Sequence, residues 1–124
     1  MKEYINITDA ELQIMKVLWE KSPLTSSEII EAVSKSTPWK PKTIHTLISR
    51  LVKKGGISAS RFSSHYQYAP LISKEELTNH ETKSFLEKLY DGSIHLLVSN
   101  FLKEESFSDE EIEELKRLLE EKNK

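Results

Sequence analysis

Four capping boxes, each a Ser or Thr followed three positions later by Glu, mark helix starts along this chain. In such a capping box the hydroxyl and the carboxylate each bond a backbone N–H that the first helical turn leaves unpaired. The boxes therefore predict four helices, at about residues 9–21, 26–35, 74–90 and 109–122. They consist of Thr8 with Glu11, Thr25 with Glu28, Ser73 with Glu76, and Ser108 with Glu111.

A further helix is predicted over residues 41–54. Pro41 suits a first helical turn, and Gly55-Gly56 supplies a left-handed stop after Lys54. At 100° per residue the apolar positions form one broad stripe, composed of Ile44, Leu47, Ile48, Leu51 and Val52. The opposite side carries hydroxyls and cations, with Lys42, Thr46, Ser49 and Lys53 at its centre.

The segments ISASRF and HYQYAP are rich in β-branched and aromatic residues, and Ser63-Ser64 separates them, which predicts a β-hairpin. Three helices followed by a hairpin indicate a winged helix-turn-helix; a generic small α+β domain is the alternative. We therefore expect a mainly α chain with a small β wing. Residues 1–72 would form the winged helix, and residues 73–124 a lobe of three helices, the middle one at 94–104.

The net charge of −2 hides a strong asymmetry between the two predicted lobes. Residues 1–72 carry ten Lys/Arg and six Asp/Glu, and no acid lies between Glu31 and Glu75. A solvated surface normally mixes both signs, so this long basic window favours a polyanionic partner, in particular double-stranded DNA. A surface that is merely basic is the alternative.

The C-terminal lobe is too short to bury its own apolar residues. About fifty residues of amphipathic helix need a partner, and self-association is the expected one. Packing of these helices back onto the winged helix is the alternative. The predicted dimer interface comprises Leu77, Phe85, Leu89, Leu97, Phe101, Ile112, Leu115, Leu118 and Leu119.

Nothing in the sequence predicts an enzyme, a cofactor or a metal site. The three glycines form no phosphate-binding loop, cysteine is absent, and the histidines lack metal-ligand spacing. The N-terminus does not resemble a signal peptide, and no apolar run is long enough to span a membrane. We expect a cytoplasmic protein that does not insert into membranes.

Three blocks of the sequence, in order, resemble the BlaI/MecI repressors of β-lactamase and methicillin-resistance genes. They are INITDAELQIMKVLW; the pattern from Trp39 to Gly55 that includes Thr43-Ile44, Thr46-Leu47-Ile48 and Arg50-Leu51-Val52-Lys53-Lys54; and FLEKLYDGSIHLLVSNFL. The resemblance implies a homodimeric winged-helix repressor on a palindromic operator. It also implies that the repressor releases its DNA when a membrane sensor of β-lactams triggers cleavage in the dimerisation lobe. By analogy with the family, the cleaved bond would join Asn100 to Phe101. His45 occupies a position that we expect to vary among family members, often as Arg or Gln, which bears on the operator bases that this chain prefers.

Recognition helices enter the major groove by their N-terminal residues, so base contacts are predicted near the start of the 41–54 helix. These residues are Lys42, Thr43, His45 and Thr46. Phosphate contacts are predicted for Lys40, Arg50, Lys53, Lys54 and Arg61. Two alternatives to an operator-binding, cleavable repressor are a winged-helix repressor relieved by a small ligand and an adaptor whose basic face binds an acidic protein.

Overall fold

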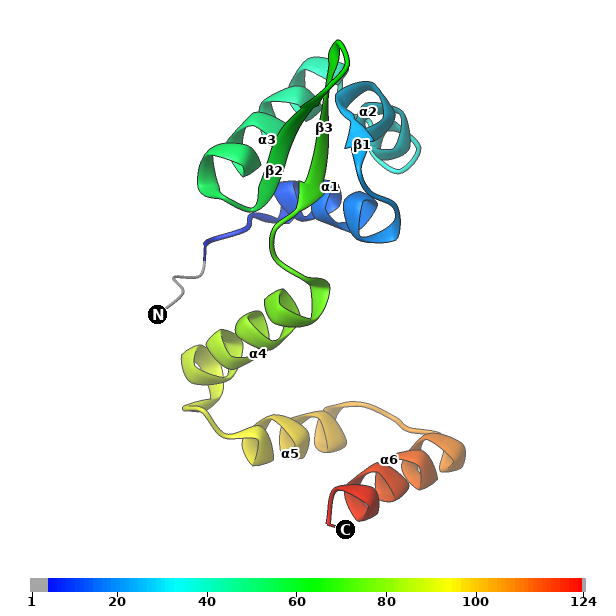
Figure 1. The fold of residues 1–124 in the computed structure, drawn as a ribbon. Helices are drawn as coiled ribbons and strands as arrows, with labels where there is room; N and C mark the ends of the chain where they lie inside the picture. Colours follow the sequence, from blue (N-terminus) through cyan, green and yellow to red (C-terminus); the bar gives the residue numbers. More distant parts are fainter. Residues whose placement is uncertain (1–4, 124) are drawn as a thin grey trace. The chain divides into compact units, whose positions relative to one another are not determined.

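A computed structural model describes residues 5–123. The chain divides into two compact units, residues 1–80 and residues 81–124. We call them the winged unit and the helical unit. Figure 1 shows the order of their helices and strands.

The core of the winged unit is formed chiefly by three helices, α1 (Asp9–Glu20), α2 (Ser26–Ser34) and α3 (Pro41–Lys54). The capping boxes at Thr8 and Thr25 are both formed, and Gly55 ends α3 in a left-handed conformation, with φ of 86°. All three helices bury one apolar face against the others. Their fully buried residues include Ile14, Met15, Leu18, Ile29, Val33, Ile44, Ile48 and Leu51.

A three-stranded antiparallel sheet completes this unit, with the order β1 (Leu24–Thr25), β3 (His65–Pro70), β2 (Ile57–Phe62). The predicted hairpin is confirmed, with Ser63 and Ser64 between its strands. Figure 1 shows β2 running back alongside α3, with which it is in contact. This arrangement confirms the winged helix. The short strand β1, which precedes α2 and pairs with β3, was not predicted.

Helices α4 (Lys74–Tyr90), α5 (Ile94–Glu104) and α6 (Asp109–Lys122) follow the wing, at the predicted positions. The division between the units falls within α4, eight residues later than the predicted boundary at residue 72. The burial of Leu77 accounts for the shift, and a hydrogen bond to Ile72 anchors the segment that leads into α4. Leu77 is only 4% exposed and belongs to the core of the winged unit, and the Trp19 Nε1–H donates to the carbonyl of Ile72 over 3.0 Å.

A buried ion pair joins the beginning of α1 to the end of α3. Glu11 is 1% exposed, and its Oε1 lies 2.6 Å from Lys54 Nζ. The same ammonium group donates to the carbonyl of Asn6 over 2.9 Å, and Oε1 also accepts from the Thr8 N–H of the capping box. Among residues 5–123 no donor reaches the other carboxylate oxygen, Oε2. The Glu11 charge therefore depends on Lys54 and the helix cap for its compensation.

The environment of Glu11 makes the stability of the winged unit depend on pH. Burial alone would raise the pKa of this carboxyl, but the hydrogen bonds from Lys54 and Thr8 favour the ionised form more strongly, and the pKa is lowered overall. A lowered pKa stabilises the fold above the pKa of the unfolded chain. That contribution is lost as pH falls through the folded value.

We predict that Glu11→Gln lowers the free energy of unfolding at pH 7 by about 1 to 3 kcal/mol, because the Lys54 ammonium group loses its charged hydrogen-bond partner. The difference from the wild type should shrink as pH falls below about 4.3, the ordinary glutamate value. Urea denaturation at pH 7, 5, 4 and 3 measures it. The capping carboxylates Glu28 and Glu111 also have lowered pKa values, but both proteins share them and their effects cancel. A difference that is constant over this range would contradict the role given to Glu11.

Candidate nucleic-acid interface

The outer face of α3 carries the side chains that the sequence assigned to base contacts. Lys42, Thr43, His45 and Thr46 are all exposed. Their orientation follows from the opposite side of the helix, where Ile44, Leu47, Ile48 and Leu51 are buried in the core. The first half of α3 therefore presents cations, an imidazole and hydroxyls to solvent.

The hydroxyl of Thr46 is held by its own helix. Oγ1 donates to the carbonyl of Lys42 over 3.0 Å, an i to i−4 bond that fixes the side-chain rotamer. Because its proton is committed, this oxygen is available to an outside partner as an acceptor. The methyl group of the same side chain can contact an apolar group such as the methyl of thymine.

The predicted phosphate contacts on α3 differ in their freedom. Lys40, at the N-cap, and Arg50 and Lys53, on the helix, are exposed. Lys54 is not a free cation, because its ammonium group is bound to Glu11 and to the Asn6 carbonyl. This bonding gives Lys54 a role in the fold that the sequence did not predict, and its phosphate contact stays a prediction. Glu11 lies 43 residues away in the sequence, and no local pattern reveals the pairing.

Arg61 lies on the wing, where an aromatic ring supports it. Arg61 pairs with Tyr66 across the two strands, and the guanidinium carbon lies 5.9 Å from the centre of the tyrosine ring. A cation over the face of an aromatic ring is attracted by its quadrupole. Tyr66 was not among the predicted site residues, although the two-residue turn at Ser63-Ser64 fixes the register that brings Tyr66 opposite Arg61.

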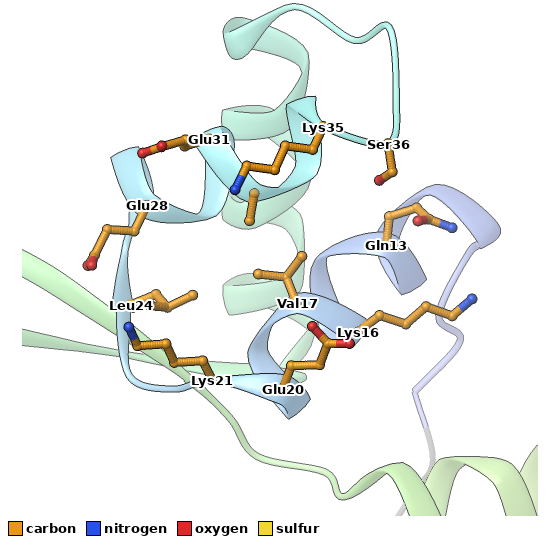
Figure 2. Close-up of a pocket in the computed structure, with 11 residues that line it drawn as sticks. Gln13, Lys16, Val17, Glu20, Lys21, Leu24, Glu28, Glu31, Lys35 and Ser36 are labelled. Atoms are coloured by element: carbon orange, nitrogen blue, oxygen red, sulfur yellow. The ribbon is translucent and has the colours of Figure 1, made fainter.

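A surface groove between α1 and α2 differs in charge from the outer face of α3. Figure 2 shows side chains of both signs around it. Lys16, Lys21 and Lys35 line the groove together with Glu20, Glu28 and Glu31. Because acids balance the bases, this groove does not select for a polyanion, whereas the outer face of α3 carries no acid.

The helical unit leaves its apolar side chains exposed. Phe85, Leu89 and Phe101 are each at least 44% exposed, and neither α5 nor α6 has a buried residue among those described. Of the predicted dimer interface, Leu77 alone is buried, and it lies in the core of the winged unit. The other members are exposed or half-buried: Phe85, Leu89, Leu97, Phe101, Ile112, Leu115, Leu118 and Leu119.

The predicted cleavage position lies inside α5. Asn100 and Phe101 are both exposed, and the Phe101 carbonyl accepts a bond from the Glu105 N–H that closes the helix. The Asn100 amide nitrogen donates to the Tyr90 hydroxyl over 3.3 Å. The ring of Tyr90 in turn lies 5.8 Å from that of Phe85, between centroids.

Residues 5–123 contain no cluster of three or more His, Asp or Glu side chains arranged to hold a metal ion. Within the same residues, none of the helices combines the length and apolar character that a bilayer crossing needs.

A helix-turn-helix whose second helix exposes a cationic face, followed by a two-stranded wing, defines the winged-helix class of proteins. Within that class, residues 7–121 match the sequence profile of the penicillinase repressors. The chain belongs to this family.

Individual relatives agree with the family match. The chain is 40% identical over 121 residues to the penicillinase repressor of Bacillus licheniformis, covering 98% of this chain and 94% of the relative. It is 38% identical over 116 residues to the methicillin resistance regulatory protein MecI of Staphylococcus aureus, covering 94% of each. Solved structures of the DNA-binding domain of the repressor BlaI, and of monomeric Bacillus licheniformis BlaI in complex with the blaP half-operator, each match with a TM-score of 0.54 and 39% identity. Each match covers 61% of this chain and 93% of the solved one.

Proposed function

We propose that this chain is a transcriptional repressor of genes of the β-lactam-resistance type, which binds a palindromic operator as a homodimer and is inactivated by proteolysis. The observation that carries the proposal is the exposed, acid-free face of α3, on a winged-helix scaffold. The relative that was solved on a half-operator supports it.

Two kinds of contact are proposed for this face. Lys42, Thr43, His45 and Thr46 would read bases in the major groove, because they lie in the first half of α3. The cations Lys40, Arg50 and Lys53, together with Arg61 on the wing, would neutralise phosphates. Such phosphate contacts position the protein on the duplex without specifying its sequence.

We predict that Lys42→Ala and Thr46→Ala each weaken binding to a blaP half-operator duplex more than binding to a random duplex of the same length. The lost discrimination should be about 1 to 3 kcal/mol for each side chain, the value of a good base contact. Fluorescence anisotropy on both duplexes at one salt concentration measures it. Equal losses on the two duplexes would remove these residues from base recognition. No binding of the wild type to either duplex would refute DNA binding itself.

The adjacent lysines Lys53 and Lys54 provide a matched pair of variants. Lys53→Gln should lower the slope of log affinity against log salt by about 0.9, because one phosphate contact and its released counterions are lost. Lys54→Gln should leave that slope unchanged, since Glu11 already compensates the Lys54 charge. Thermal unfolding should show the reverse order, with only Lys54→Gln destabilised. A reduced slope for Lys54→Gln would show that this ammonium group is available to DNA.

Self-association through the helical unit is proposed from its exposed apolar residues. An exposed stripe of Leu, Phe and Ile is a typical interaction surface, and each large side chain buried contributes about 1.5 to 3 kcal/mol. A second copy of the chain offers the same stripe and would cover it symmetrically. Two DNA-binding units joined in this way would bind two half-sites with a gain of about 100-fold from effective concentration.

The proposed switch is cleavage between Asn100 and Phe101, which the family resemblance suggests. A membrane sensor of β-lactams, or a protease that it activates, would be the partner that triggers the cut. The bond lies within α5, so cleavage would require local opening of this helix. Cutting there would detach Phe101 and all of α6, with Ile112, Leu115, Leu118 and Leu119. The dimer would lose much of its interface while the face of α3 stayed unchanged.

A chain that ends at Asn100 reproduces the larger product of this cut. We predict that it sediments as a monomer at a concentration where the full chain is a dimer. Its affinity for a single half-site should remain within a factor of about two, whereas its affinity for the whole operator should fall about 100-fold.

A dimer of the shortened chain would contradict the proposed interface, and a monomer of the full chain would contradict dimerisation as a whole. Mass spectrometry of the protein from β-lactam-treated cells that carry the sensor tests the position of the cut. It should show a fragment that ends at Asn100, and any other terminus would rule out this bond.

A further inference from the structure

A small groove separates α3 from the wing. It is lined by Ser49 and Val52 of α3 and by Ala59, Tyr66 and Tyr68 of the two strands. Of these, Val52 and Tyr68 are partly buried and pack against the core of the winged unit. The hydroxyl-bearing residues Ser49 and Tyr66 are exposed at its rim.

Two exposed hydroxyl groups at the rim of this groove have no partner among the described residues, and the third lining hydroxyl belongs to the half-buried Tyr68. Within the described part of the chain, neither the Ser49 hydroxyl nor the Tyr66 hydroxyl forms a hydrogen bond. This contrasts with Thr46, one turn earlier on α3, whose hydroxyl is bonded to its own helix. Ser49 and Tyr66 therefore present two free donors on opposite walls of the groove.

The charges around the groove have one sign. Arg61 stacks on the ring of Tyr66, and Lys53 is the next exposed cation on the same side of α3. No acidic residue occurs between Glu31 and Glu75, the stretch that supplies both walls. Free donors beside fixed cations favour an anion whose oxygens only accept hydrogen bonds, as phosphate oxygens do.

We propose that this groove seats one sugar–phosphate strand of the duplex, with the hydroxyls of Ser49 and Tyr66 donating to a phosphate. The ring of Tyr66 is also a positioning group, because it holds the Arg61 guanidinium for the same strand. The inference rests on the proposed function and adds two uncharged ligands, Ser49 and Tyr66, to the cations that the sequence analysis identified.

The size of the groove favours a strand over a separate small molecule. Its volume is about 230 Å³ and it is open to solvent, whereas sites that enclose small ligands occupy about 300 to 1,000 Å³. A polymer that runs along the groove needs no enclosure, since its affinity is shared with the neighbouring contacts on α3. The α3 face and the groove would then bind the base edges and the backbone of the same stretch of DNA.

Uncharged and charged phosphate ligands differ in a way that titration can measure. Tyr66→Phe and Ser49→Ala should each weaken binding to the blaP half-operator duplex and to a random duplex alike, by about tenfold, because a hydrogen bond to a charged group is lost. The slope of log affinity against log salt should not change, since no cation is removed. Tyr66→Leu should weaken binding further than Tyr66→Phe, because Arg61 then also loses its support.

Replacing single phosphates of the duplex by uncharged methylphosphonates locates the contact. At one position the methylphosphonate should lower the affinity of the wild type. The same replacement should hardly lower the affinities of Tyr66→Phe and Ser49→Ala, because these variants have already lost their hydrogen bond to that phosphate. Ser60→Ala provides the matched control. Ser60 is exposed on the same strand as Arg61 but, by strand alternation, on the face turned away from the groove, so this variant should bind like the wild type.

Several outcomes would overturn the inference while leaving the proposed function intact. In each, the wild type binds the half-operator duplex. Unchanged affinity of both Tyr66→Phe and Ser49→Ala would show that the groove is not occupied by the strand. A loss confined to the half-operator would assign the two hydroxyls to bases instead of a phosphate, and additive losses at every methylphosphonate position would exclude a shared phosphate. Failure of the wild type to bind any duplex would instead refute the proposed function.

Discussion

The pairing of Glu11 with Lys54 fixes the helix on which the candidate interface lies. The two residues connect the first turn of α1 to the last turn of α3, and Lys54 also holds the chain that leads into α1 through the Asn6 carbonyl. A buried carboxylate without this partner would be costly, so the pair constrains the end of α3 more strongly than apolar packing alone would. Because the pair restrains the last turn of α3, the opposite face of that helix is presented to solvent as a defined surface. Lys54 thus supports the helix on which the candidate interface lies.

Local signals predicted most of the fold, and long-range ones were missed. Capping boxes, Pro41 and the Gly55-Gly56 stop act over a few residues, so the helix positions could be read from the sequence. The strand Leu24–Thr25 has two residues and exists only because β3 pairs with it, a contact between segments some forty positions apart. The burial of Leu77 was missed for the same reason. The amphipathic pattern of α4 places Leu77 on an apolar face, but only the tertiary structure shows that the core of the winged unit covers this residue.

The candidate interface shows the same division. Exposure of Lys42, Thr43, His45 and Thr46 follows from the 3.6-residue period of α3 and was predicted correctly. The sequence did not predict that Lys54 is bound to Glu11 while Lys53 is exposed. Both are cations at the end of one helix, and only a distant carboxylate distinguishes them. Tyr66 was overlooked because its role depends on cross-strand register. The sequence therefore identifies which side chains face outward more reliably than which of them are free to bind.

Gly56 brings together three segments that are far apart in the sequence. Its N–H donates to the Leu51 carbonyl and its own carbonyl accepts from the Leu71 N–H, each over 2.9 Å. A Cβ atom at this position would lie 3.0 Å from Ile5 Cδ1 and 3.2 Å from Leu51 Cδ2, so the absence of a side chain lets the N-terminal segment pack here. The consequence concerns synthesis on the ribosome. The corner cannot close until residue 71 has emerged, long after Ile5, so the nascent helices must keep their apolar faces from other chains until the wing is complete.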